Sequence, residues 1–529
     1  MKPVRLLSGF MTVGFWTLAS RILGFARDIM IASFLGTGPV AEAFLVAFSL
    51  PNMFRRFFAE GAFNTAFVPL FSKKLQKDDD PVGFARDALT GLATVLIVFT
   101  LVAQLVMPWL VLAMASGFRG DARFDLTVDF GRITFAYILF ISLAALLSGV
   151  LNASGRFAAA AAAPVLLNII LVGALLLGQS GLFDGYLPAD RAELPGLSQG
   201  HLLVWATLLA GIAQMALVWI AASSAGYRLM PRRPRLTPDL KRLAVIAGPA
   251  MLAGGVVQIN LLVGRQVASF FDGAIAWLSY ADRLYQLPLG VVGIAVGIVL
   301  LPDLSRRLAA ADTAGAQHAF SRAGEISLAL TIPSAIALVA IPLPLVSVLF
   351  ERGAFSFADS QATAWAVAIY GLGLPAFVLQ KVLQPLYFAR EDTRTPFRFA
   401  LIAMVVNAVV AIVGAALLGF VGAAIGTTVA GWAMVWQLAR GTGEMGQSAR
   451  FDARFRRRIW RILIAALLMG ALLMLAAWLL SPWLYSPGIR YPALALLVLV
   501  GICSYFTIGA LIGAFRLSDF KASLRRSAG

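Results

Sequence analysis

Apolar stretches of about 20 residues recur from one end of this chain to the other, and they constrain its fold more than any other feature. A helix of about that length crosses the roughly 30 Å hydrocarbon core of a bilayer. Backbone polar groups in that core must find internal partners, which a helix provides. Hydrophobic residues make up 60% of the 529 residues and charged residues 13%, which no soluble globular class matches. The sequence therefore predicts an all-α integral membrane protein.

The apolar stretches predict about 14 transmembrane spans by the 20-residue criterion. In chain order the spans cover residues 8–35, 41–72, 86–115, 130–152, 158–178, 201–226, 243–271, 275–302, 322–348, 361–388, 397–418, 421–440, 459–480 and 491–515. The first stretch is too long for a cleavable signal and carries internal arginines, so we expect it to stay as a helix.

Basic residues gather in every second loop between the spans, as in 73–77, 228–242 and 450–461. The alternate loops, such as 36–40, 121–129 and 184–193, are short or carry balanced charge. The positive-inside rule places the basic loops in the cytoplasm. Both termini are then cytoplasmic, and an even number of spans agrees with this. The same pattern explains the net charge of +17 better than nucleic-acid binding does.

A short sequence repeats near the ends of the second and eighth spans: VPLFSKKL at 68–75 and LPDLSRRL at 301–308. Both of these spans run from outside to inside, so the two halves have the same orientation, as in transporters with parallel repeats. The alternative is a chance match of a common helix-end sequence. The repeat predicts two six-helix bundles, at 1–228 and 229–445. Residues 446–529 then hold two extra helices.

Ionisable residues occur inside several spans, where each costs roughly 2.5–3.5 kcal/mol on insertion scales. Arginines outnumber nearby carboxylates, and guanidinium groups match phosphate oxygens with paired hydrogen bonds. We therefore predict one internal cavity that holds an anion, and a diphosphate satisfies several arginines at once. The substrate-binding candidates are Arg21, Arg27, Asp28, Arg55, Arg56 and Arg283, and the gate or cavity candidates are Glu42, Glu60, Asp282, Arg265 and Asn52.

The candidates in the first span have a structural alternative. Arg21 and Asp28 are seven residues apart and share a helix face, so an internal pair between them can seal a bundle. Arg27 points about 120° away and has no acidic neighbour on its own face. The structural alternative therefore fits Arg27 less well than Arg21.

Four other candidates also have purely structural alternatives. Arg56 and Glu60 are four residues apart and can pair with each other, which leaves Arg55 freer. Glu42 is either a solvated helix-end carboxylate or part of an outer gate. Arg265 either joins the site or extends outward to the interface.

The rest of the chain offers little for metal or redox chemistry. Cys503 is the single cysteine, and the two histidines, His201 and His318, form no metal-binding pattern. We predict no metal site and no cofactor. The last two spans carry no charge in their interiors, so they either pack against lipid or wall a groove for an apolar tail. The basic run 450–461 either fixes topology or binds anionic lipid.

Several stretches resemble one known family, the MurJ (MviN) lipid II flippases of the MOP exporter superfamily. They are SRILGFARD at 20–28, AFLVAFSLPNMFRRFFAEGAF at 43–63, YADRL at 280–284 and the Leu-Pro pair at 301–302. The likeness extends over all the predicted spans in length and layout. The second stretch is long and specific.

The resemblance implies a transporter and not an enzyme. Its cargo would be the undecaprenyl-diphosphate-linked disaccharide-pentapeptide precursor of peptidoglycan. Alternating access would carry this lipid from the inner to the outer leaflet of the bacterial cytoplasmic membrane. Arginines matching Arg21, Arg27, Arg55 and Arg283 are functional cavity residues in the family, and Asp28 and Arg56 also match it. At Glu42 the family usually has aspartate.

The resemblance also implies partners and an energy source. The partners are lipid II itself, membrane lipids and the cell-wall synthesis machinery. Family members use ion gradients or the membrane potential differently, so coupling to either stays open for this chain.

Three other functions compete with this interpretation. A related MOP exporter would move another polyprenyl-linked glycan or a drug, although a drug-cation exporter should show unpaired carboxylates. A membrane enzyme would need a catalytic carboxylate or metal cluster, and the acidic run 78–80 beside lysines is typical of a solvated turn. A scaffold for cell-wall synthesis has no use for costly intramembrane arginines.

Overall fold

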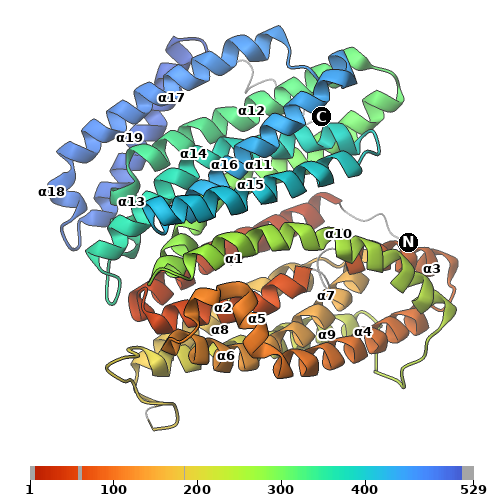
Figure 1. Cartoon of the computed structure of the whole chain (residues 1–529). Coiled ribbons are helices and arrows are strands. Elements are labelled where there is room, and N and C mark those ends of the chain that lie inside the picture. The colour runs from red at the N-terminus through yellow and green to blue at the C-terminus, as the bar shows by residue number, and fades with distance from the viewer. Residues whose placement is uncertain (1–5, 57–61, 184, 515–529) are drawn as a thin grey trace. The chain divides into compact units, whose positions relative to one another are not determined.

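The structure is a computed structural model that describes residues 6–56, 62–183 and 185–514, with side chains except at 6–10, 62–65, 248–261 and 291–299. Within these ranges the regular elements are helices, and β-pairing is confined to an isolated bridge between Arg191 and Leu194 (Figure 1). The predicted all-α class is confirmed. The helices are α1 (Leu6–Leu35), α2 (Pro39–Arg55), α3 (Ala62–Lys77), α4 (Pro81–Leu105), α5 (Met107–Ala115), α6 (Ala122–Phe135), α7 (Tyr137–Ala153), α8 (Ala158–Gln179), α9 (Leu197–Ser224), α10 (Pro238–Ala268), α11 (Ala274–Ala309), α12 (Thr313–Ala340), α13 (Pro342–Phe350), α14 (Phe357–Phe388), α15 (Arg394–Leu418), α16 (Val421–Gly441), α17 (Ala453–Leu479), α18 (Ser481–Leu484) and α19 (Arg490–Leu511).

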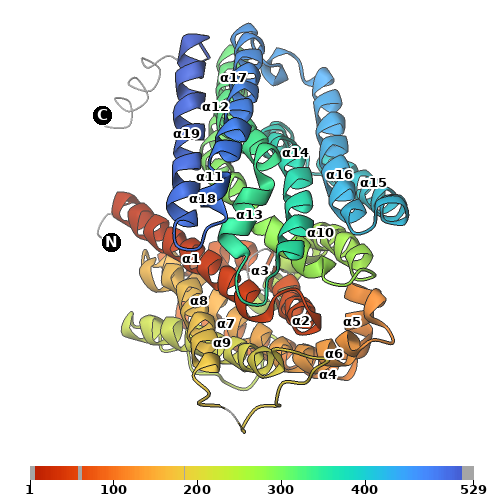
Figure 2. The same cartoon turned by 90° about the vertical axis from the view of Figure 1, so that its left-hand side faces the viewer.

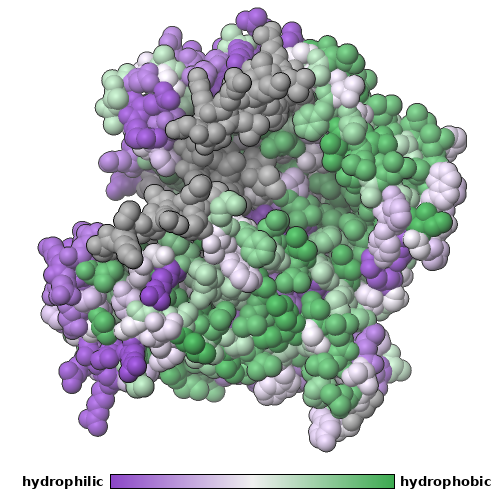
Figure 3. Space-filling view, turned by 180° about the vertical axis from the view of Figure 1, so that it is seen from behind, coloured by the Kyte–Doolittle hydropathy of each residue, from purple (hydrophilic) through white to green (hydrophobic). Residues whose placement is uncertain are grey.

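Ten helical stretches in the described part of the chain are long and apolar enough to cross a membrane. They are Pro81–Leu105, Ala122–Ala153, Ala158–Gln179, Leu197–Ser224, Thr313–Ala340, Phe357–Phe388, Arg394–Leu418, Val421–Met445, Gln447–Leu479 and Arg490–Leu511. Large apolar side chains such as Trp365, Trp478 and Leu511 are exposed, and hydrophobic groups cover broad areas of the face in Figure 3. Such a surface suits lipid, because soluble proteins rarely expose apolar patches of this extent.

Each predicted span coincides with at least one helix. Four of the spans coincide with helices outside those ten: α1, α2 with α3, α10, and α11. Helices α2 and α3 have only 17 and 16 residues. Parts of α1, α10 and α11 lie outside the residues described with side chains. The count of about 14 spans therefore stays a prediction.

Prolines divide two of the predicted spans. The span 86–115 is two helices, and α5 begins at Met107 with Pro108 in its first turn. The span 322–348 is also divided: α12 ends at Ala340, and α13 begins at Pro342. Proline lacks a backbone N–H and clashes with the preceding turn, so it starts a helix better than it continues one.

The expected outer loop at 121–129 is wrong, because most of it is helical. The Asp121 side chain accepts a hydrogen bond from the Arg123 backbone N–H (2.9 Å), and α6 begins at Ala122. A capping aspartate satisfies one of the free N–H groups of the first turn. The charged residues from Arg123 to Asp129 therefore lie on a helix.

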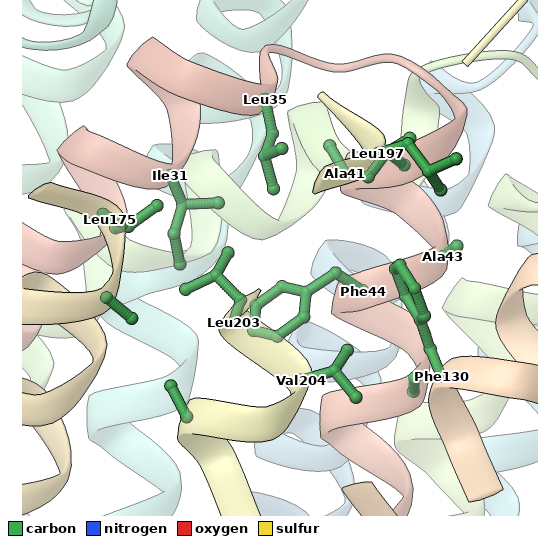
Figure 4. Packing of buried hydrophobic residues seen from close by; sticks show 14 of the residues in the cluster. Ile31, Leu35, Ala41, Ala43, Phe44, Phe130, Leu175, Leu197, Leu203 and Val204 are labelled. Atoms are coloured by element: carbon green, nitrogen blue, oxygen red, sulfur yellow. The ribbon is translucent and has the colours of Figure 1, made fainter. Parts of the chain in front are cut away.

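The first of two compact units comprises Met1–Ala276 together with Arg352–Phe355. Helix α10 packs on α3 and α5, and the Ala354 N–H donates to the Ser33 carbonyl (2.7 Å). The core of this unit joins α1, α2, α6, α8 and α9. Phe44 of α2 points toward Leu203 and Val204 of α9 (Figure 4). This core fixes α1, which carries the predicted site, against α8.

The second unit comprises Trp277–Glu351 and Ser356–Gly529. Its core joins α12, α17 and α19, and α17 and α19 lie side by side (Figure 2). The two repeated octapeptides lie at the C-terminal ends of α3 and α11. The division into two bundles, 1–228 and 229–445, and a segment 446–529 stays a prediction.

Candidate anion-binding site

Arg27 and Asp28 form a buried ion pair on α1. The Nε and NH2 groups of Arg27 both donate to Oδ1 of Asp28, at 3.0 and 2.7 Å. The guanidinium also lies over the Phe48 ring of α2, 5.8 Å from its centroid. The expectation that an ion pair within this helix fits Arg27 less well than Arg21 is therefore wrong. The long arginine side chain reaches back to its neighbour, which the angular argument from Cβ directions did not allow for.

Asn168 of α8 completes this group. Its Oδ1 accepts a hydrogen bond from NH1 of Arg27 (2.9 Å), and its Nδ2 donates to the backbone carbonyl of Ser20 (2.9 Å). The Asn168 side chain is only 5% exposed. An apolar helix therefore supplies one neutral acceptor to a buried charge, which reduces the cost of burying that charge.

Arg21 does not join this pair. Its side chain is exposed, and no hydrogen bond or ion pair reaches it from the described residues. The alternative pairing of Arg21 with Asp28 is thus not formed. Arg21 is instead a free cation one turn before Phe25 on α1.

The candidates on α2 lie near its C-terminal end. Arg55 is half-buried, and Arg56 is exposed at a helix end that turns into a π-type turn. The Asn52 side chain donates to the Phe48 carbonyl (2.7 Å), so its amide is hydrogen-bonded to the backbone of its own helix next to Pro51. Glu60 lies outside the described residues, and its predicted pairing with Arg56 stays a prediction.

Glu42 of α2 is neither solvated nor alone. It is 1% exposed; one carboxylate oxygen accepts from NH1 of Arg123 (2.9 Å) and the other from the Ile275 backbone N–H (3.0 Å). Arg123 of α6 also contacts Asp121 (2.6 Å) and Asp272 (2.8 Å). The solvated interpretation of Glu42 is wrong, because this network joins α2, α6, Asp272 and the first turn of α11.

A second polar contact joins α10 to the end of α5. The Gln266 side chain accepts from the Ser116 backbone N–H (3.0 Å) and donates to the Ser116 hydroxyl (2.7 Å). Ser269 accepts from the Gly117 N–H (2.9 Å). Gln266 and Ser269 therefore connect the C-terminal end of α10 to the residues that follow α5. Arg265 beside them is half-buried.

The second unit holds the remaining candidates. Asp282 and Arg283 of α11 are both half-buried, and the Gln286 amide donates to Asp282 one turn later. The side chains of adjacent residues do not face each other on a helix, so Asp282 and Arg283 each need a separate interaction partner. Both residues lie in the first half of α11, and their place in a cavity stays a prediction.

The basic run 450–461 is partly neutralised. Glu325 of α12 is buried and pairs with Arg322, Arg458 and, at 3.6 Å, Arg454. Arg322 also contacts Asp452 (2.6 Å), the capping residue of α17. Some of these arginines therefore hold α17 against α12.

The chemistry available at Arg27 follows from its donor count. A guanidinium carries five N–H donors. The contacts to Asp28 and Asn168 use three N–H groups of Arg27. One N–H on NH1 and one on NH2 have no hydrogen-bond partner among the described residues. Guanidinium N–H groups suit phosphate oxygens. Across the described ranges, no group of three or more His, Cys, Asp or Glu side chains gathers as a metal site.

Sequence reasoning missed Asn168, Arg123 and Glu325. Asn168 is the polar residue in the middle of an otherwise apolar stretch, VLLNIILV, and that isolation is a usable signal. Arg123 was counted only as a loop charge, because its helix was not predicted. Glu325 lies at the predicted start of the ninth span, where a carboxylate is ordinarily solvated.

The family model and the curated relatives point to one family. The family model described as "Lipid II flippase MurJ" matches residues 31–496. A "Probable lipid II flippase MurJ" of Rhizobium meliloti (strain 1021) is 44% identical over 530 residues, which cover 99% of this chain and 97% of the relative.

Two of the solved structures that resemble this fold illustrate the likeness. One is titled "Lipid II flippase MurJ, inward closed conformation", with a TM-score of 0.76, 24% identity and coverage of 95% of this chain and 98% of that chain. The other is an inward-facing multidrug resistance MATE transporter of the MOP superfamily, with a TM-score of 0.64, 14% identity and coverage of 82% and 96%. Both likenesses concern the fold alone.

Proposed function

This chain belongs to the lipid II flippase MurJ family, and from that premise we propose that it moves lipid II across a bacterial membrane. The observation that carries the proposal is sequence identity of 44% over nearly the whole length of a probable lipid II flippase. The chain is a multi-pass membrane protein. The cargo is the peptidoglycan precursor on its undecaprenyl diphosphate carrier, moved from the inner to the outer leaflet.

The polar head of this cargo requires a cationic site in an apolar protein. We infer that Arg27 supplies part of it, because two of its N–H groups stay outside the bonds to Asp28 and Asn168. Arg21, Arg55, Arg56 and Arg283 are the other proposed binding residues. Guanidinium forks bind phosphate oxygens in pairs, so several arginines together suit a diphosphate.

Orientation and energy source are further parts of the proposal. The protein lies in the cytoplasmic membrane with both termini in the cytoplasm, because the basic loops then obey the positive-inside rule. Either the membrane potential or a monovalent-ion gradient drives the cycle. One charge moved through 100 mV changes the free energy by about 2.3 kcal/mol, so either source is large enough to bias the direction of transport.

The proposal is tested by measuring lipid II at the outer leaflet of intact cells with a probe that cannot cross the membrane. We expect that depletion of the protein lowers exposed lipid II while total lipid II accumulates. Re-expression of the wild-type chain should restore exposure, and an Arg283→Ala variant that still inserts should not. Unchanged exposure after depletion, in cells with no other flippase, would contradict the substrate assignment.

A further inference from the structure

Asn168 has an unusual position for an amide. It lies in the apolar helix α8 and is 5% exposed. Its Nδ2 group donates to the carbonyls of Ser20 (2.9 Å) and Pro164 (3.3 Å). Because the amide nitrogen is held by two carbonyls, the side-chain oxygen must point the other way. That oxygen accepts from NH1 of Arg27.

The packing of α1 on α8 fixes this register. Ser20, Gly24 and Arg27 follow one helix face with spacings of four and three residues. A Cβ atom at Gly24 would lie 3.5 Å from the Asn168 amide nitrogen, so Asn168 lies directly over that face. One turn further along α1, Ile31 joins the buried core with Leu171 and Leu175 of α8. The Asn168–Arg27 contact is therefore held by apolar packing on its outer side.

The choice of a neutral acceptor has an electrostatic consequence. Asp28 already balances the charge of Arg27 and engages it through a single oxygen. An amide oxygen orients the guanidinium through NH1 without adding negative charge. A second carboxylate at this place would repel a diphosphate, and an apolar side chain would leave the guanidinium free to rotate fully onto Asp28.

We propose that Asn168 is a positioning residue for Arg27, holding its guanidinium so that two N–H groups stay available to the phosphate oxygens of the cargo. This inference rests on the proposed function. Asn168 acts through Arg27 and does not itself contact the cargo. It therefore matters only while Arg27 is present, which separates positioning from a general packing role.

The test measures binding of lipid II and of undecaprenyl diphosphate to the purified full chain in nanodiscs. We expect Asn168→Leu to weaken both affinities roughly tenfold, which is the scale of one hydrogen bond to a charged group. Asn168→Asp should weaken them more, because it adds negative charge. In an Arg27→Ala background, Asn168→Leu should have no further effect.

Gln214 provides the matched control. This buried amide of α9 donates to the Ala163 carbonyl of α8 (2.8 Å) and accepts from the Tyr137 hydroxyl (3.1 Å), without a contact to Arg27. Gln214→Leu should lower the unfolding temperature about as much as Asn168→Leu does, yet leave both affinities unchanged.

The possible results separate the inference from the proposed function. If Arg27→Ala weakens binding but Asn168→Leu does not, or if the two effects add fully, the positioning role is overturned and the proposed function stands. If the wild-type chain binds neither lipid, the proposed function fails and this inference fails with it.

Discussion

Two buried arginines in the first unit, Arg27 and Arg123, show how similar surroundings can serve different ends. Each lies over a phenylalanine ring, Arg27 over Phe48 and Arg123 over Phe118. Each joins helices that are distant in sequence. They differ in the number of carboxylates around them: Arg27 contacts one, and Arg123 contacts three.

We propose that this ratio separates a structural arginine from a binding arginine. Arg123 forms ion pairs with Glu42, Asp121 and Asp272, so three carboxylates surround one guanidinium and an anionic ligand is repelled. Arg27 is balanced by one carboxylate and oriented by one amide. A buried arginine that is not saturated by carboxylates can still bind an anion.

The comparison is tested most strongly at Arg27 itself. Arg27→Ala should lower lipid II transport by roughly 100-fold or more, because it removes two available donors and the buried ion pair with Asp28. Transport is measured as lipid II exposed at the outer leaflet of cells whose only copy is the variant. Arg27→Lys should recover little, since an ammonium lacks the guanidinium fork.

Membrane insertion is the necessary control for this loss. The Arg27→Ala protein should be present in the membrane fraction at a level similar to the wild type. Normal transport by Arg27→Ala would show that the carboxylate ratio does not identify a binding arginine.

Arg123→Ala should act on stability and not on the cargo. Removing the guanidinium leaves Glu42 buried without its cation, which costs about 3–5 kcal/mol. We expect a large fall in the unfolding temperature of the purified protein. The double variant Glu42→Gln, Arg123→Met should recover part of this loss, because no buried charge is then unpaired. Unchanged stability with lost lipid II binding would instead place Arg123 in the binding site.

The helical class could be predicted from the sequence, because the length of apolar stretches is visible directly. Ionisable residues within those stretches of α1, α2 and α11 could be selected as site candidates for the same reason. Prediction failed where side-chain reach decides the contact. Arg27 bonds its own neighbour Asp28, which Cβ directions on an ideal helix do not suggest. Long-range partners such as Asn168 depend on which helices pack together, and a single sequence does not determine that packing.

Helix breaks were the other failure, and they had a local signal. Pro108 lies in the first turn of α5 and Pro342 begins α13, and both helices start inside a predicted span. Asp121 caps α6 where a loop was expected. These residues were visible in the sequence, but hydropathy averaged over about 20 residues hides them.

A smaller effect is expected when the Glu42 carboxylate is shortened. Glu42→Asp keeps the charge but draws the carboxylate back by one methylene, so it cannot reach both Arg123 and the Ile275 N–H. Loss of one of these bonds should cost about 1–2 kcal/mol. The unfolding temperature should fall less than in Arg123→Ala, and lipid II affinity should not change. A loss as large as that of Arg123→Ala would mean that both bonds break together.

The smallest effect is expected at Gly24, which faces Asn168. A methyl group there would lie 3.5 Å from the amide nitrogen, an ordinary contact, and alanine favours a helix over glycine by up to about 1 kcal/mol. Gly24→Ala should therefore leave lipid II affinity unchanged and raise stability slightly. Gly200 is the contrasting site, because a Cβ there would lie 2.5 Å from the Val40 side chain, so Gly200→Ala should destabilise the same unit. If Gly24→Ala weakens binding while stability is unchanged, the Asn168–Arg27 contact tolerates less displacement than its geometry indicates. The orientation of Arg27 would then matter more for binding, in contrast to Arg123, which carboxylates surround.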